Sequence, residues 1–320
     1  MIAQDLLFAR KGMTMNRIVI DTDPGIDDAH AIMLAFAYPE TRVEAITTVA
    51  GNVPLERTTA NALILLDILG RDVPVFSGCE DALVIPTSRR AISHGTDGLG
   101  DSGYPLSRRI SLPEHAAQAL IRMANESPGE LTLVALGPLT NIALATRLDP
   151  KLPEKYKRLV ILGGAYHAVG NSWTPAAEFN FSTDPESAAI VLDRWPGSTI
   201  VPWETAMEYG LTSQWIDELN AIDSPRAEFF RKIFRNRALV QLKEQGICYD
   251  PDPLAMAVAL EPEIIRRVEK RYVKVELAGQ LTRGQTVVDW YGLTGNPPNT
   301  TLVLEIDRQR YEELLRLSLK

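Results

Sequence analysis

Four aspartates near the N-terminus have the clearest chemical meaning in this sequence. Asp21, Asp23, Asp27 and Asp28 lie within eight positions, and no Lys or Arg occurs between residues 18 and 39. Carboxylates that fold together repel one another unless a cation or hydrogen-bond donors compensate their charge. A hard divalent cation, which prefers oxygen ligands, is the simplest compensation. The segment therefore predicts a metal site.

Three other interpretations of this segment can be weighed from residue types. Asp27 and Asp28 could occupy the first turn of a helix, where acidic groups favour the helix dipole, but this accounts for only two of the four. An EF-hand loop needs Gly at position six and Glu at position twelve, and both positions counted from Asp21 are isoleucine. A phosphoryl-transfer motif built on Asp21 and Asp23 begins in the same way and stays open as an alternative.

The aspartates follow the first of several short apolar runs that must position them. Strand-like runs at 17–21, 43–50, 131–136, 158–162 and 198–201 alternate with helix-like runs at 27–38, 55–69, 139–147 and 185–193. Such alternation predicts an α/β fold with an open, mixed, mostly parallel sheet flanked by helices and a Rossmann-like core. Because such sheets bind ligands beyond the carboxyl ends of their strands, we expect the polar residues after each strand to converge there.

The rest of the chain continues as one unit. Residues 211–260 are predicted to be mainly helical, followed by strands at 272–277, 286–289 and 301–306 and a closing helix from Arg308. No internal repeat or Pro/Ser-rich linker divides the sequence, so we expect a single domain over residues 15–320. Residues 1–14 precede the first strand and are interpreted as an N-terminal extension.

The composition excludes several classes of protein. The chain has 320 residues, 45% hydrophobic and 23% charged, which argues against disorder, collagen and coiled coil. A net charge of −8 disfavours general nucleic-acid binding. No apolar run reaches the roughly 18 residues of a membrane span, and no signal peptide is evident. Two cysteines cannot form a disulfide framework, which favours a reducing compartment, and we expect a cytoplasmic location.

The motifs that follow the strands, taken in order, resemble those of the inosine-uridine preferring nucleoside hydrolases. The similar segments are DTDPGIDDAHAI at 21–32, AGN at 50–52, HGTDGLG at 94–100, LGPLTNIA at 136–143, LGGA at 162–165, GNSWTPAAEFN at 170–180, DPESA at 184–188, DPLAMA at 252–257 and RGQTVVD at 283–289. The resemblance covers nearly the whole chain from Arg17. It implies hydrolysis of the N-glycosidic bond of ribonucleosides to ribose and a free purine or pyrimidine base.

The resemblance also implies a Ca²⁺ ion and a set of site residues. The metal ligands would be Asp23, Asp28, Asp252 and the backbone carbonyl of Leu136, with Asp23 also taking a proton from the metal-bound water. The ribose hydroxyls would be held by Asp27, Asn52, Asn171, Glu178 and Asn180. These residue types suit the reaction, because carboxylates stabilise an oxocarbenium-like sugar and amide groups pair with hydroxyls that both donate and accept.

The sequence departs from the family pattern in two places. The segment from Asn171 to Glu178 is one residue longer than the usual form, which bears on the role of Asn171. Many members have His immediately before the last metal-binding Asp, where it protonates the leaving base, but this chain has Pro251. The predicted acids are then His94 and Tyr249. Other routes stay open: Cys248 as a donor, or aromatic stacking by Trp173 or Trp203. Asp250 is a second candidate for the last metal ligand.

Two rival functions stay open, and the first of them follows from the missing histidine. A non-catalytic nucleoside- or ribose-binding protein could retain the calcium site and lack leaving-group activation, and a phosphatase-like enzyme could use Asp21 and Asp23. The presence of Asp23 and of every ribose-binding residue type favours the hydrolase. The resemblance further implies a homo-oligomer, a dimer or tetramer, with a small-molecule ribonucleoside as the ligand, and no nucleic acid or membrane is expected as a partner.

Overall fold

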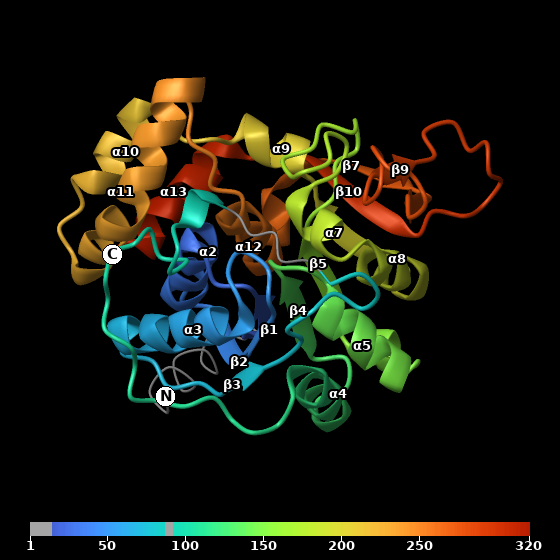
Figure 1. Cartoon of the computed structure of the whole chain (residues 1–320), viewed down its shortest axis with the longest axis horizontal. Coiled ribbons are helices and arrows are strands. Elements are labelled where there is room, and N and C mark those ends of the chain that lie inside the picture. The colour runs from blue at the N-terminus through green and yellow to red at the C-terminus, as the bar shows by residue number, and fades with distance from the viewer. Residues whose placement is uncertain (1–14, 87–91) are drawn as a thin grey trace.

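The centre of the molecule is an eight-stranded sheet, seen in a computed structural model that describes residues 15–86 and 92–320 (Figure 1). Its strands lie in the order β3-β2-β1-β4-β5-β6-β10-β7. Their bounds are Val75–Ser77, Thr41–Thr48, Asn16–Thr22, Leu131–Ala135, Arg158–Leu162, Ser198–Val201, Thr300–Ile306 and Ile265–Arg271. Only the β10–β7 pair is antiparallel, so the predicted open, mixed and mostly parallel sheet is confirmed. The predicted N-terminal extension, residues 1–14, lies outside the described residues.

Helices cover both faces of this sheet because the buried strands are apolar on both sides. Along β1, Ile18 and Ile20 face one hydrophobic cluster and Val19 faces the other, as the two-residue period of a strand requires. The first cluster includes residues of α2 (Ile26–Ala37), α3 (Leu55–Leu69), α11 (Pro225–Gln245), α12 (Asp252–Leu260) and α13 (Arg308–Ser318). The second includes residues of α4 (Ala116–Glu126), α5 (Thr140–Leu148) and α8 (Pro185–Arg194).

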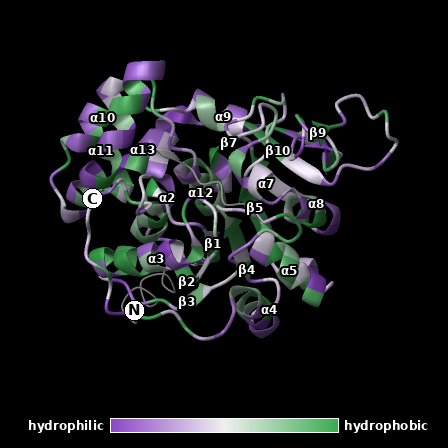
Figure 2. Cartoon of the chain, viewed as in Figure 1, coloured by the Kyte–Doolittle hydropathy of each residue, from purple (hydrophilic) through white to green (hydrophobic). Residues whose placement is uncertain are grey.

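The remaining elements lie at the edges of this layered core. They are the short helices α6 (Leu152–Lys155), α7 (Phe179–Thr183), α9 (Trp203–Glu208) and α10 (Ser213–Asn220), the 3-10 turns Ile92–His94 and Pro262–Ile264, and the antiparallel pair β8 (Val273–Val275) and β9 (Thr286–Val288). The hydropathy colouring in Figure 2 shows mixed hydrophilic and hydrophobic residues along the peripheral helices α8, α10 and α11. The long loop after β9 projects from the body of the molecule (Figure 1).

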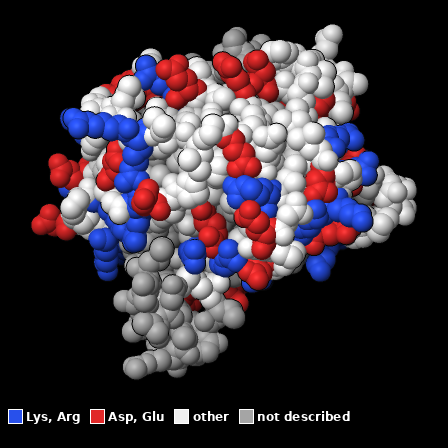
Figure 3. Space-filling model, turned by 90° about the horizontal axis from the view of Figure 1, so that it is seen from below, with Lys and Arg blue, Asp and Glu red and all other residues white. Residues whose placement is uncertain are grey.

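The surface carries charges of both signs. On the face shown in Figure 3, acidic and basic side chains are interspersed over the described residues. Across residues 15–86 and 92–320, no helix has the length and apolarity to cross a membrane. An open, mostly parallel sheet binds ligands at the carboxyl ends of its strands, so we expect the functional site there.

Candidate active site

A cavity of about 420 Å³ opens at the carboxyl ends of the central strands. It brings together nine of the eleven predicted metal, substrate and catalytic residues: Asp27, Asn52, His94, Leu136, Asn171, Glu178, Asn180, Tyr249 and Asp252. Asp23 and Asp28 do not line the cavity and lie buried beside it, at 1% and 0% exposure. Its volume falls within the range of small-molecule sites. Segments from six or more parts of the chain thus meet at the predicted edge of the sheet.

The turn from β1 into α2 places Asp27 at this cavity and Asp28 buried beside it. Gly25 caps the helix, and its backbone N–H donates to Asp28 Oδ2 at 2.9 Å, while the hydroxyl of Thr22 donates to Asp28 Oδ1. A Cβ on Gly25 would lie 2.3 Å from His94 Nδ1, so only glycine allows this close approach. The helix therefore begins with Asp27 and Asp28 fixed in its first turn.

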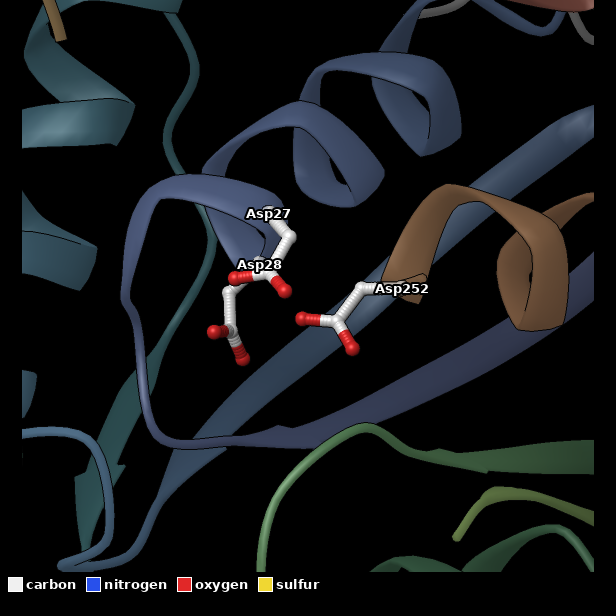
Figure 4. A group of neighbouring side chains, drawn as sticks. All are labelled: Asp27, Asp28 and Asp252. Atoms are coloured by element: carbon white, nitrogen blue, oxygen red, sulfur yellow. The ribbon is translucent and has the colours of Figure 1, made fainter. Parts of the chain in front are cut away.

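Asp27, Asp28 and Asp252 form a compact carboxylate cluster. One oxygen from each lies within 4.8 Å of the others. Figure 4 shows the first two at the start of α2 and Asp252 at the start of α12, with their carboxylates turned toward one another. Burial and the charge of Asp27 raise the pKa of Asp28 to about 6. Burial, together with the three other aspartates, raises the pKa of Asp252 well above its ordinary range.

Asp23 lies in a tight pocket of backbone behind this cluster. Its Oδ2 accepts a hydrogen bond from the backbone N–H of Asn52 at 2.6 Å. Burial and Asp28 raise the pKa of Asp23 well above its ordinary range. A Cβ at Gly51 would lie 2.0 Å from Asp23 Oδ2, and one at Gly137 would lie 2.6 Å from Oδ1, so two glycines make room for this carboxylate.

The donor set fits a hard divalent cation. The cluster is made of buried carboxylate oxygens, and Oδ1 of the neighbouring Asp23 has no hydrogen-bond partner among the described residues. Oδ1 of Asp27 is paired with Arg237 Nη1 at 3.2 Å. Unpaired buried carboxylate oxygens are costly unless a cation or a donor satisfies them. The carbonyl oxygen of Leu136 accepts one hydrogen bond, from Asn180 Nδ2 at 2.7 Å, and its second lone pair could serve a cation. Calcium accepts these ligand types.

Glu178 and Asn180 are held by the start of α7. Glu178 accepts from the backbone N–H groups of Asn180 at 2.9 Å, Phe181 at 3.1 Å and Gly164 at 3.0 Å. Burial raises the pKa of Glu178 to about 7 against the opposing effect of these hydrogen bonds. Asn171 is exposed at the cavity, where its Oδ1 accepts from the N–H of Phe179 at 2.7 Å.

His94 and Tyr249 both reach the cavity, and their surroundings differ. Nδ1 of His94 accepts a hydrogen bond from the backbone N–H of Ile26 at 3.0 Å, so the ring proton sits on Nε2. Burial lowers the pKa of His94 to about 4. Its imidazole is therefore neutral at pH 7 and can donate one hydrogen bond. The ring of Tyr249 meets that of Trp203 edge-on, with centroids 5.2 Å apart.

Sequence reasoning missed three polar residues of α11 at this site. Arg237, Gln241 and Gln245 recur every four residues and line the cavity. Nη2 of Arg237 donates to Asp27 Oδ2 at 3.2 Å, and Arg237 and His94 lower the pKa of Asp27 despite its burial. Their four-residue spacing on a helix was the available signal. No sequence motif indicated that this face of α11 lies toward the aspartates.

Four other residues have structural partners. The fully buried Asp21 accepts from Thr47 at 2.5 Å and from Asn141 at 2.8 Å, and Asn141 also accepts from the N–H of Cys79. His30 lies between Asp250 at 2.6 Å and Ser318 at 2.8 Å. Asp21 and Asp250 do not line the cavity, and Asp252 is the C-terminal member of the carboxylate cluster.

Known proteins are similar to this chain in sequence and in fold. Residues 18–313 match the family described as inosine-uridine preferring nucleoside hydrolase. A pyrimidine-specific ribonucleoside hydrolase RihA from Enterobacter sp. (strain 638) is 37% identical over 308 residues, covering 93% of this chain and 96% of the relative. The corresponding protein of Salmonella typhimurium is 38% identical with the same coverage.

Solved structures of nucleoside hydrolases superpose on this chain. A structure titled inosine-guanosine nucleoside hydrolase superposes with a TM-score of 0.90 at 35% identity, covering 96% of this chain and 99% of that one. A purine-preferring ribonucleoside hydrolase from Gardnerella vaginalis superposes with a TM-score of 0.85 at 29% identity, covering 94% and 98%. With the motifs in order, the carboxylate cluster at the sheet edge and these matches over nearly its whole length, the chain belongs to the inosine-uridine preferring nucleoside hydrolase family.

Proposed function

We propose that this protein is a calcium-dependent N-glycosidase that hydrolyses ribonucleosides to ribose and a free purine or pyrimidine base. The observation that carries the proposal is the buried carboxylate cluster of Asp27, Asp28 and Asp252 beside a cavity lined with amide and carboxylate groups. Membership of the family gives the reaction class. A cation bound by the cluster would lie next to a sugar bound in the cavity.

The proposed calcium ligands are Asp23, Asp28, Asp252 and the carbonyl oxygen of Leu136. Asp27 belongs to the carboxylate cluster and could contribute an oxygen as well. When bound, Ca²⁺ would supply Lewis acidity that lowers the pKa of a coordinated water. The unpaired Oδ1 of Asp23 and the raised pKa values of Asp23 and Asp252 support a cation, because a positive charge would offset both the repulsion between these carboxylates and the cost of their burial.

The protein's own groups account for the remaining chemistry. Asp23 would accept a proton from the attacking water through its unpaired Oδ1, while its other oxygen is fixed by the N–H of Asn52. Asp27, Asn52, Asn171, Glu178 and Asn180 would bind the ribose hydroxyls. Their carboxylates would also stabilise positive charge that develops on the sugar as the bond to the base breaks.

Leaving-group activation is proposed to involve His94 and Tyr249. With its pKa lowered to about 4, His94 is neutral at pH 7, so it offers an Nε2–H hydrogen bond to the leaving base but rarely carries the extra proton that a general acid transfers. Tyr249 and Trp203 form an aromatic edge at the cavity and could stack on the base. The α11 residues Arg237, Gln241 and Gln245 add hydrogen-bond donors that could pair with the base.

The rival functions are less well supported. A phosphatase based on Asp21 needs that carboxylate to reach a substrate, yet Asp21 is fully buried, bonded to Thr47 and Asn141, and outside the cavity. A non-catalytic nucleoside-binding protein is less well supported because relatives that match nearly the whole chain are named nucleoside hydrolases. A cytoplasmic location and a homo-oligomeric assembly are part of the proposal and follow from the sequence-based expectations above.

The deciding experiment measures reducing-sugar release from a panel of purine and pyrimidine ribonucleosides. The purified protein is assayed as isolated, after chelation of divalent ions, and after Ca²⁺ is restored. We expect ribose release that chelation abolishes and Ca²⁺ recovers. Phosphate release from phosphomonoesters without ribose release would favour the phosphatase. Nucleoside binding without turnover in the Ca²⁺-loaded protein would favour the binding protein.

A further inference from the structure

Glu204 is a buried carboxylate beside the cavity to which the proposed function gives no role. It lies on α9, next to Trp203, and is only 7% exposed. Its Oε2 accepts from the backbone N–H of Tyr166 at 2.9 Å, and its Oε1 accepts from that of His167 at 2.7 Å. The N–H of Val169 lies 3.5 Å from the same Oε1. Among the described residues, no Lys, Arg or His forms an ion pair with Glu204, so backbone dipoles compensate its charge.

The segment that Glu204 holds leads directly to the sugar side of the cavity. It follows β5 and precedes α7, and Figure 1 shows this loop close to α9. Val169, Gly170 and Asn171 from this segment line the cavity. Within it, Ala168 has a φ of +59°, a left-handed conformation that costs free energy for a residue other than glycine. Such a turn persists only where surrounding contacts favour it, and the carboxylate provides them.

Other hydrogen bonds fix the position of α9, which carries Glu204. The backbone N–H of Trp203 donates to the carbonyl of Gly164 at 2.9 Å, and the hydroxyl of Thr205 donates to that of Val303 in β10 at 2.8 Å. On the other side of the loop, the His167 ring stacks on Trp290 with centroids 6.1 Å apart. The loop is therefore held through its backbone by Glu204 and through its side chains by the segment after β9.

We propose that Glu204 is a positioning residue that fixes the 166–170 loop so that Asn171 meets the ribose. This inference rests on the proposed ribonucleoside hydrolase function. Glu204 itself does not line the cavity, so it acts through the loop. Its carboxylate accepts hydrogen bonds from the backbone N–H groups of Tyr166 and His167. It thereby fixes the position of the loop from which the chain continues to Asn171.

The test uses Glu204→Gln in the Ca²⁺-loaded full chain. An amide keeps the size of the side chain but replaces one acceptor oxygen with a donor, so either Tyr166 or His167 loses its acceptor. We expect KM for a ribonucleoside to rise about tenfold with kcat within about threefold of wild type, because the loss falls on substrate binding. Amide hydrogen exchange at residues 166–169 should quicken about tenfold or more in the same variant.

A double-mutant cycle separates positioning from general destabilisation. In an Asn171→Ala background, Glu204→Gln should change KM less than about twofold, because the group it positions is already gone. Glu276→Gln is the matched control: Glu276 also accepts two loop N–H groups, of Ala278 and Gly279, but does not line the cavity. Its KM should stay at the wild-type value. If Glu204→Gln does not fold, Glu204→Asp, whose shorter carboxylate cannot span both N–H groups, replaces it in the cycle.

Two outcomes would overturn the inference. An unchanged KM in the Glu204 variant, or additive effects with Asn171→Ala, would show that Glu204 does not act through Asn171. Absence of ribose release from wild-type protein would contradict the proposed function instead. The hydrogen-exchange measurement would still report whether Glu204 holds the loop, so the two failures are distinguishable.

Discussion

Replacing Asp28 with asparagine should stabilise the metal-free protein and weaken its response to calcium. Asp28 is fully buried, with Oδ2 accepting from Gly25 N–H at 2.9 Å and from Asn52 Nδ2 at 3.0 Å. An asparagine oxygen can keep both bonds. Its NH₂ group would then face the hydroxyl of Thr22, which can rotate to accept instead of donate. The substitution therefore removes a buried charge while every polar atom keeps a partner.

The magnitude follows from the pKa of this carboxyl. Burial and the charge of Asp27 raise the pKa of Asp28 from 3.8 to about 6. The folded state then binds a proton more tightly than the unfolded state, so stability falls as pH rises from about 4 to about 6 and stays lowered above it. At ~1.4 kcal/mol per pKa unit, the charged form costs ~3 kcal/mol at pH 8. For a chain of this length, that corresponds to about 5 °C in Tm.

Thermal unfolding with and without metal is the assay. In chelator at pH 8, the Asp28→Asn variant should melt up to about 5 °C above wild type, and the difference should shrink toward pH 4. Added Ca²⁺ should raise the Tm of wild type and barely move that of the variant, because ligand binding to the folded state is what stabilises it. Asp289→Asn, at an exposed loop, serves as the control and should keep the full calcium response. A variant less stable than wild type in chelator, or one with an intact calcium response, would refute this reasoning.

Three further predictions test the sugar, the leaving base and the backbone around Asp23. Ribonucleosides should exceed 2′-deoxyribonucleosides in kcat/KM by roughly 10⁴-fold or more, because a missing hydroxyl leaves buried partners unpaired; equal rates would contradict a ribose-specific site. His94→Ala and Tyr249→Phe should slow natural nucleosides more than p-nitrophenyl riboside, whose leaving group needs no proton; equal losses in parallel assays would remove both residues from base activation. Gly51→Ala should lower activity by at least about 100-fold, because its Cβ would lie 2.0 Å from Asp23 Oδ2; wild-type kcat would show that Asp23 needs no fixed place.

The parts of the fold that follow from local pattern were predictable from the sequence. Alternating apolar runs and helix-like runs identified the inner strands and their helices, and the strand at 158–162 and the helix at 55–69 match their predicted bounds. The strand β7 was not predicted. Its sequence, IRRVEKR, is polar and largely exposed because it pairs only with β10 at the edge of the sheet. Its pairing depends on a partner distant in the chain, which no local period records.

The candidate site was predictable where a side chain belongs to a strand-end motif. Aspartates and asparagines that follow parallel strands must meet at one edge, so their convergence follows from topology. The structure also explains why glycine occurs in two of those motifs, since Gly51 and Gly137 leave room for the Asp23 carboxylate. Pro251, whose side chain has no proton to donate, lines the cavity next to Asp252. The sequence could not show that His94 accepts a hydrogen bond from Ile26, and this contact fixes which ring nitrogen carries the proton.

Arg237 and Glu204 escaped notice because their roles depend on tertiary contacts alone. Arg237 is one of several arginines on a polar helix, and its approach to Asp27 joins positions 210 residues apart. Glu204 is set in a short helix and meets backbone groups 35 to 38 residues earlier. Almost any residue type can supply a backbone N–H group. A side chain that binds such groups therefore produces no recognisable sequence pattern in the segment that it contacts. For that reason a charged residue in such a position is found only when its burial and its hydrogen bonds are seen together.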